Sequence, residues 1–167
     1  MTELETVIAD HRAAVEQFIA RARGIDAVKW ATARGEGQWS PAQVVEHLAI
    51  FYEYNRKVVR GDAGGGAPRF LRPLARWFVV ERTLKAGRFT RKGRAPGMLQ
   101  PVATTPPPAA ELLARLSAAV AGMEADMRSG HPEARHTIDH PFFGRLDTKD
   151  WLRLQAIHAR HHRSQLT

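Results

Sequence analysis

Four long stretches of the sequence carry an apolar residue at every third or fourth position, and this periodicity limits most strongly what the chain can fold into. The stretches span residues 4–22, 44–58, 112–127 and 151–165. Each stretch forms a helix with one apolar face, and that face must be buried against a partner. We identify no strand pattern between them. The sequence therefore predicts an all-α fold in which four helices bury their faces in one antiparallel bundle.

Residues typical of helix ends bracket all four stretches. Hydroxyl or carboxylate side chains that can cap a helix, or a proline suited to its first turn, precede each stretch. Glycines, which favour the end of a helix, follow three of them. The starts are Thr2 with Glu5, Ser40 with Pro41, Pro108, and Asp147 with Asp150, and the ends are Gly24, Gly61 and Gly130.

Length and composition set further limits. A chain of 167 residues is typical of one domain, which we expect to span residues 1–167. The absence of cysteine excludes a disulfide framework, a thiolate zinc site and a cysteine nucleophile, so any metal must be held by His, Asp or Glu. The opening MTELETVIAD lacks the features of a secretory signal, and no run of about 18 apolar residues is present. We expect a cytoplasmic protein without a transmembrane segment.

A basic segment lies between the second and third predicted helices. Residues 69–94 hold nine Lys or Arg and one acid, Glu81, so this segment carries the entire net charge of +8. Its first part, residues 69–86, fits a shorter helix that bears Phe70 and Trp77. Residues 87–108 are rich in glycine and proline and predict a long basic loop.

Histidines occupy inward positions on two of the helices. At 100° per residue, His47 lies at the centre of the apolar stripe of residues 44–58, and His158 has the same place in the last helix. His162 lies one turn beyond His158, a spacing that suits two ligands of one metal. His161, three residues from His158, is the rival of His162, and periodicity favours His162 only slightly.

Two interpretations of the three inward histidines remain open from spacing alone. One is a polar core satisfied by hydrogen bonds, and the other is a divalent metal bound by three imidazoles with open coordination positions. His11 also points inward, but its depth in the first helix does not match that of His47, so we leave it out as a ligand. His140 lies beside prolines in a loop, where solvent exposure or packing in a turn is the simpler interpretation.

Three segments resemble signature regions of the DinB-like superfamily. They are WSPAQVVEHL at 39–48, HPFFGRLDTKDWLRLQAIH at 140–158 and HARHHRSQL at 158–166. The resemblance implies an up-down-down-up four-helix bundle, often dimeric, that binds a divalent metal such as zinc, nickel or iron. It also implies that His47, His158 and His162 are the ligands. His161 and Gln165 match neighbouring positions of the motif.

The resemblance further implies a class of function. We expect a metal-dependent enzyme that acts on a small-molecule substrate, namely a low-molecular-weight-thiol S-transferase or a related hydrolase. Tyr54, on the face of His47, is a candidate contact to the ligand. Four basic residues are candidates to attract an anionic substrate: Arg88, Arg91, Lys92 and Arg94.

The alternative function is binding without catalysis. In that case the segment 69–94 would contact nucleic acid or an acidic surface, although no helix-turn-helix, zinc finger or RNA-binding motif accompanies its charge. Its aromatic residues also fit a homodimer interface, which is compatible with either function.

Overall fold

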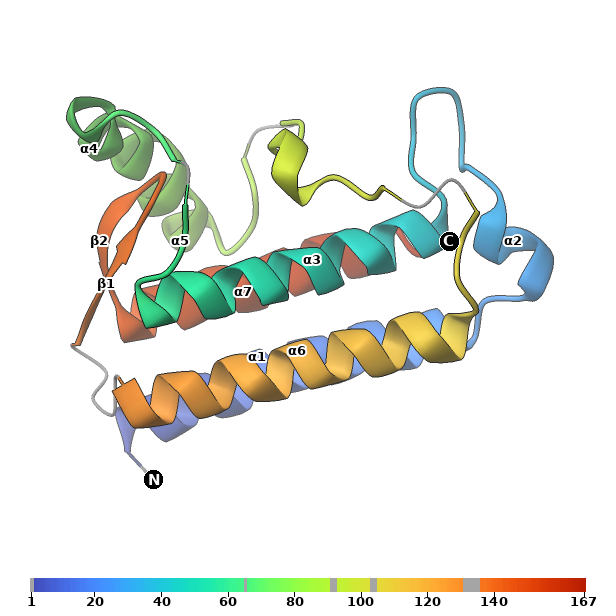
Figure 1. Ribbon diagram of the computed structural model, residues 1–167, viewed down its shortest axis with the longest axis horizontal. Coiled ribbons are helices and arrows are strands. Elements are labelled where there is room, and N and C mark those ends of the chain that lie inside the picture. Colours follow the sequence, from blue (N-terminus) through green and yellow to red (C-terminus); the bar gives the residue numbers. More distant parts are fainter. Residues whose placement is uncertain (1, 65, 91–92, 103–104, 131–135) are drawn as a thin grey trace.

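Four long helices form the body of the protein. A computed structural model describes residues 2–64, 66–90, 93–102, 105–130 and 136–167. The long helices are α1 (Glu3–Arg23), α3 (Pro41–Arg60), α6 (Ala109–Gly130) and α7 (Thr148–Arg163). In Figure 1, α1 and α7 run in one direction while α3 and α6 run in the other. The expected up-down-down-up bundle is confirmed.

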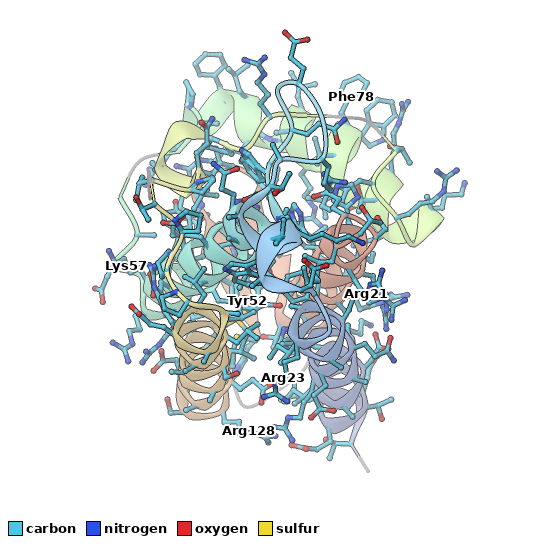
Figure 2. All side chains as sticks on the ribbon, turned by 90° about the vertical axis from the view of Figure 1, so that its right-hand side faces the viewer. Arg21, Arg23, Tyr52, Lys57, Phe78 and Arg128 are labelled. Atoms are coloured by element: carbon cyan, nitrogen blue, oxygen red, sulfur yellow. The ribbon has the colours of Figure 1, made fainter. Side chains whose placement is uncertain are left out.

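The helices pack most closely in two parallel pairs. α3 lies against α6, and α1 lies against α7. Viewed along the bundle in Figure 2, the four helices stand at the corners of a square, with α3 and α7 above α6 and α1. The core between them contains side chains that are fully shielded from solvent, among them Phe18, Tyr52, Leu116, Met123 and Trp151. Within the described residues, no helix has the length and apolar character needed to cross a membrane.

Local capping fixes where the helices begin, as the sequence predicts. Ser40 and Gln43 form a reciprocal capping box at the start of α3, where Pro41 takes a position that needs no N–H donor. The Asp147 side chain accepts a hydrogen bond from the Asp150 backbone N–H at 2.7 Å and so caps α7. These caps fix the residues at which α3 and α7, the two helices that carry the inward histidines, begin.

The basic segment is helical but broken into short pieces. The pieces follow one another as η1 (Arg69–Leu71), α4 (Arg72–Ala75), the π-helical η2 (Arg76–Glu81) and α5 (Arg82–Ala86). The single helix expected over residues 69–86 is therefore replaced by four consecutive turns of different pitch. Two further short helices, α2 (Ala27–Ala31) and η3 (Gly97–Leu99), lie in stretches without a periodic signal. The second of these, η3, lies within residues 87–108, for which the sequence predicted a loop.

A β-hairpin corrects the expectation that the chain has no strands. β1 (Thr137–His140) pairs antiparallel with β2 (Gly144–Asp147), and Ile138 faces Leu146 with both side chains buried. Each strand holds only one large apolar residue, Ile138 or Leu146, so the sequence shows no alternation of apolar and polar positions. Because β2 ends at the residue that caps α7, the hairpin directly fixes the start of this helix.

Candidate metal centre

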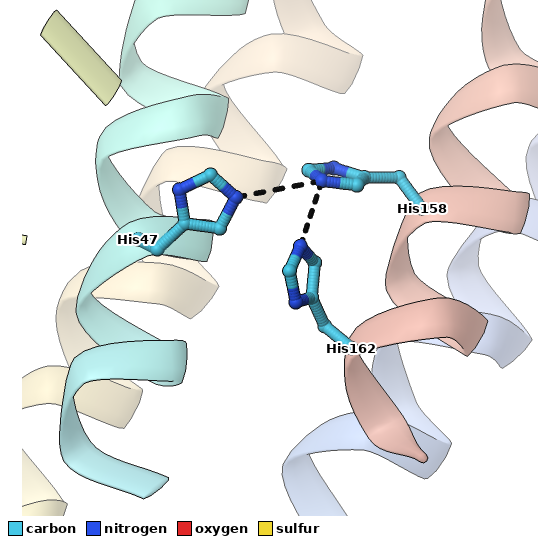
Figure 3. A group of neighbouring side chains, drawn as sticks. All are labelled: His47, His158 and His162. Carbon is cyan, nitrogen blue, oxygen red and sulfur yellow. Dashed lines mark hydrogen bonds between the residues drawn. The ribbon is translucent and has the colours of Figure 1, made fainter. Parts of the chain in front are cut away.

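Three histidines from two helices point at one another across the space between α3 and α7. His47 lies in the second turn of α3, and His158 and His162 lie one turn apart near the end of α7 (Figure 3). The Nε2 atom of His158 is 3.5 Å from that of His47 and 2.9 Å from that of His162. All three ligand atoms lie within 4.8 Å of one another. Among the described residues, this group alone meets the geometry of a metal site with three ligands.

The spacing of the nitrogens matches a single bound ion. With metal–nitrogen bonds of 2.0–2.1 Å in tetrahedral geometry, ligand nitrogens are separated by roughly 3.3 Å. The two separations from the His158 Nε2 atom lie on either side of this value. Two of the three separations are thus close to those around one divalent cation, and the third pair of ligand atoms lies within 4.8 Å.

Hydrogen bonds on the outer side orient two of the rings. The Nδ1–H group of His47 donates to the backbone carbonyl of Leu99 at 2.6 Å, and that of His162 donates to Oε1 of Gln165 at 2.8 Å. Since carbonyl oxygens only accept, the proton of each ring sits on Nδ1. The Nε2 atom of each ring then has a free lone pair directed toward His158.

Because the Nε2 lone pairs of His47 and His162 both face Nε2 of His158, hydrogen bonds within the triad cannot satisfy all three nitrogens. His158 Nε2 carries at most one proton and donates it to either His47 or His162, so one inward lone pair lacks a donor. If His158 instead keeps its proton on Nδ1, that buried atom has no hydrogen-bond partner among the described residues. A divalent cation accepts all three Nε2 lone pairs together, and the residues present therefore fit a metal better than a closed hydrogen-bonded core.

Burial keeps the imidazoles in the neutral form that binds metals. His47 and His162 are 3% and 6% exposed. Burial lowers the pKa of His47, and it lowers the pKa of His158 well below its usual value, with the other histidines adding to the effect. Burial and the neighbouring His47 lower the pKa of His162 to about 3. At neutral pH each ring therefore keeps one unprotonated nitrogen that can bind a metal.

Aromatic rings form the walls of the site. Trp39 lies 4.9 Å from His47, and Phe51 lies 4.1 Å from His158, measured between ring centroids. Phe89, which follows α5, lies 5.8 Å from His158, so the basic segment also reaches the site. Such a shell limits the access of water and lowers the local dielectric constant. Phe89 and the Leu99 carbonyl come from the stretch between α5 and α6, far in sequence from the histidines, and no motif pointed to them.

The other residues predicted for the site occupy different places. Gln165 contacts both His162 and His161, and its Nε2 atom lies 3.2 Å from Nε2 of His161. His161 is exposed and packs on Phe89, with ring centroids 5.2 Å apart. The hydroxyl of Tyr54 donates instead to the backbone carbonyl of Gly64 at 3.3 Å.

The predicted contacts to an anionic substrate can be placed only in part. Arg88 is exposed and directly precedes Phe89, which packs on the triad. Arg94 is exposed a few residues before η3, whose Leu99 binds His47. Arg91 and Lys92 lie outside the described residues. The two arginines that are described thus flank the segments that touch the histidines.

His11 and His140, which the sequence analysis did not assign as ligands, belong to other structures. His11 is buried among three helices, where Nε2 is 2.9 Å from the Tyr52 hydroxyl and Nδ1 is 3.3 Å from Glu124. His140 is buried in β1, accepts the backbone N–H of Phe142 at Nδ1 and lies over the ring of Phe143. His140 therefore follows the turn-packing interpretation.

Comparison with known proteins gives a family and a fold. The sequence model of the DinB superfamily matches residues 10–166. Among solved structures, the crystal structure of TT2238, a four-helix bundle protein, matches with a TM-score of 0.59 and 23% sequence identity, over 98% of this chain and 97% of that chain. At this identity the likeness concerns the fold alone. No curated protein matches the chain.

Proposed function

Because the chain belongs to the DinB superfamily, we propose that it is a divalent-metal-dependent enzyme that transfers a low-molecular-weight thiol to a small-molecule acceptor. The observation that carries this proposal is the group of three neutral imidazoles whose ligand atoms lie within 4.8 Å of one another. Structural zinc sites are normally closed by four protein ligands, whereas three ligands leave a position for a substrate.

The residues of the chain supply the setting for this chemistry. When bound, a divalent cation such as zinc, nickel or iron supplies Lewis acidity that lowers the pKa of a thiol or a water molecule beside it. Leu99 and Gln165 hold two of the rings in the tautomer that presents Nε2. Phe51 and Phe89 pack on His158 and restrict the access of bulk water. The chain has no cysteine, so a reacting thiol must come from the substrate side.

Charge near the site favours an anionic substrate. Arg88 and Arg94 are exposed on the loops that carry Phe89 and η3, and the segment around them is strongly basic. A carboxylate on the thiol or on its acceptor would be drawn toward the triad by this field. Hydrolysis is the neighbouring reaction, with water in place of the thiol, and it uses the same histidines.

An assay of thiol transfer tests the proposal. Protein loaded separately with zinc, nickel or iron(II) is mixed with glutathione, cysteine or 2-mercaptoethanol and with a small alkyl halide as the acceptor. We expect thioether formation above the buffer rate with at least one metal, and its loss in His158→Ala. Hydrolysis of a test ester without consumption of thiol would overturn the transferase assignment. A metal-loaded protein that accelerates neither reaction would contradict an enzymatic role for the site.

A further inference from the structure

The first part of the basic segment, residues 69–79, turns its apolar side chains toward solvent. Phe70 and Trp77 are 77% and 56% exposed, and none of the described side chains from residues 69–79 is buried. We define the outer apolar face as the large exposed apolar side chains of this stretch: Phe70, Leu71, Leu74, Trp77, Phe78 and Val79. Several of them recur at the spacing of one helix side, and Figure 2 shows Phe78 turned away from the bundle. A contiguous exposed face of this kind typically marks an interaction site.

Arginines hold this face outward. Nε of Arg72 donates to the backbone carbonyl of Ala67 at 3.0 Å, and its Nη1 lies 3.6 Å from the carboxylate of Asp139 in β1. Nη1 of Arg76 donates to the backbone carbonyl of Arg145 in β2 at 2.7 Å. Within residues 69–79, two arginines therefore contact the hairpin while the large apolar side chains do not, the reverse of an ordinary surface helix. Burial of apolar side chains begins at Val80.

Cations border the outer apolar face. The guanidinium carbon of Arg82 lies 5.3 Å from the ring centroids of both Trp77 and Phe78. Lys85 in α5 and Arg88 just after this helix continue the exposed basic surface. The segment 69–94 carries the whole net charge of the chain, so its partner must offer both negative charge and an apolar interior.

We propose that the outer apolar face docks on an anionic lipid surface. Aromatic and aliphatic side chains on one side, bordered by Arg and Lys, are the features with which peripheral segments enter the headgroup region and bind acidic lipids. Phe70, Leu74 and Trp77 insert between the lipids, while Arg82 and Lys85 bind the headgroups. The proposal is independent of the metal centre.

Two other partners fit the face less well. A twofold contact between two copies would bring two segments of charge +8 together, which charge repulsion opposes. Binding of single-stranded nucleic acid uses open aromatic faces on which bases stack. Here Trp77 and Phe78 pack edge to face, with ring centroids 4.5 Å apart, and Arg82 lies over both. The exposed aliphatic Leu74 and Val79 also have no role in contacting phosphates.

Binding to vesicles tests the proposal directly. The full chain is sedimented with vesicles of phosphatidylcholine, either pure or containing phosphatidylglycerol, while tryptophan emission is recorded. Trp30 and Trp151 are buried and Trp39 is partly buried, so Trp77 is the tryptophan that reports on a change of surroundings at the surface. We expect binding and a blue shift only with phosphatidylglycerol. In Trp77→Phe, binding should persist and the blue shift should disappear.

Matched variants separate the contribution of the apolar side chains from that of the cations. The triple variant Phe70→Ser/Leu74→Ser/Trp77→Ser should lose vesicle binding, whereas the control Val28→Ser/Met98→Ser/Val102→Ser, at exposed apolar positions elsewhere, should retain it. Arg82→Gln and Lys85→Gln should each weaken binding roughly fivefold. Arg23→Gln and Lys57→Gln, which are exposed on the bundle, should leave it unchanged. All these side chains are exposed, so the melting temperature should stay near that of the wild type.

Four outcomes would overturn the proposal. The first is the absence of sedimentation with phosphatidylglycerol vesicles. The second is binding without a blue shift, which would mean that the apolar face does not enter the lipid. The third is a dimer that the triple serine variant abolishes while vesicles remain unbound, which would assign the face to a second copy of the chain. The fourth is tight binding of an RNA oligonucleotide in place of vesicles.

Discussion

The side chain of Gln165 contacts the adjacent histidines His161 and His162 and orients the ring of His162. Its Oε1 atom accepts from His162, which fixes the ring with Nε2 toward the triad. We predict that Gln165→Leu lowers metal affinity about 10- to 100-fold, the usual cost of losing an outer partner of a ligand. Gln165→Glu, which keeps an acceptor, should lose less. Titration against a chelator measures both, and equal affinities for the wild type and the leucine variant would contradict the role of this bond.

We predict that the buried side chain of His140 lowers the free energy of unfolding in acid. Burial and nearby Arg72 lower its pKa to about 4 in the folded protein, against about 6.5 in an unfolded chain. The unfolded state therefore takes up the proton first, so stability is full above pH 6.5 and falls until the pH reaches about 4. Between pH 7 and 5 this residue should remove about 2 kcal/mol from the free energy of unfolding.

Chemical denaturation of the wild type and His140→Asn across this pH range tests the prediction. Asparagine can still accept the Phe142 N–H that His140 accepts at Nδ1. The wild type should lose more stability in acid than the variant. Parallel stability curves would show that His140 is not responsible.

The sequence predicted the histidines of the site but not all the groups that surround them. Helical spacing indicated that His47 and His158 face inward, and the structure brings both together with His162. Spacing did not decide between His161 and His162, which the family resemblance did. The Leu99 carbonyl and Phe89 could not be found, because a backbone acceptor and a packed ring from distant loops leave no motif in the sequence. The assignment of the three histidines as ligands stays a prediction.

At the scale of elements, the buried face of α3 differs from the expected stripe centred on His47. Tyr52 is fully buried although it lies roughly 140° around the helix from His47. Phe51 and Tyr54, which lie on the face of His47, are only partly buried. The reason is that α3 packs closely on α6 as well as facing α7. Helix positions were thus predictable from periodicity and caps, but the rotation of each helix depends on which neighbour it packs against.

A buried polar network ties three of the helices together. Glu124 of α6 contacts both His11 and Arg12 of α1, and His11 reaches Tyr52 of α3. We predict that Glu124→Leu lowers the free energy of unfolding by about 2–3 kcal/mol, because the buried His11 loses a partner and Arg12 loses its ion pair. Denaturant titration measures this loss. Metal content should not change, and a loss of metal would show that the network and the triad are coupled.

At the scale of the whole molecule, the charge is confined to one segment while the rest of the chain is neutral. If this segment attracts an anionic substrate, Arg88→Ala/Arg94→Ala should raise KM severalfold, leave kcat nearly unchanged and reduce the dependence of kcat/KM on salt. Arg23→Ala/Lys57→Ala, which removes two exposed cations from the bundle, is the control. An unchanged KM in the first variant would remove these arginines from substrate attraction.

The overall topology was accessible from the sequence, whereas the connections were not. Four periodic stretches and their caps predict the bundle, and the family resemblance adds the order of directions. The segment 69–86 carries a helical pattern that normally indicates a buried face, and its later part does bury Val80. The side chains of the outer apolar face are exposed, because it is Arg72 and Arg76 that contact the hairpin. Periodicity shows that a face is apolar, but it does not show whether a partner within the chain covers it.

The measurement that tests the central claim most directly is the metal content of the purified protein. Elemental analysis would compare the wild type, His158→Ala and His161→Ala, all purified without chelator. About one zinc, nickel or iron ion per chain is expected in the wild type and in His161→Ala, and none in His158→Ala. A wild-type protein that takes up no divalent metal on titration, or an equal metal content in His158→Ala, would contradict the account and leave the three histidines as a polar core.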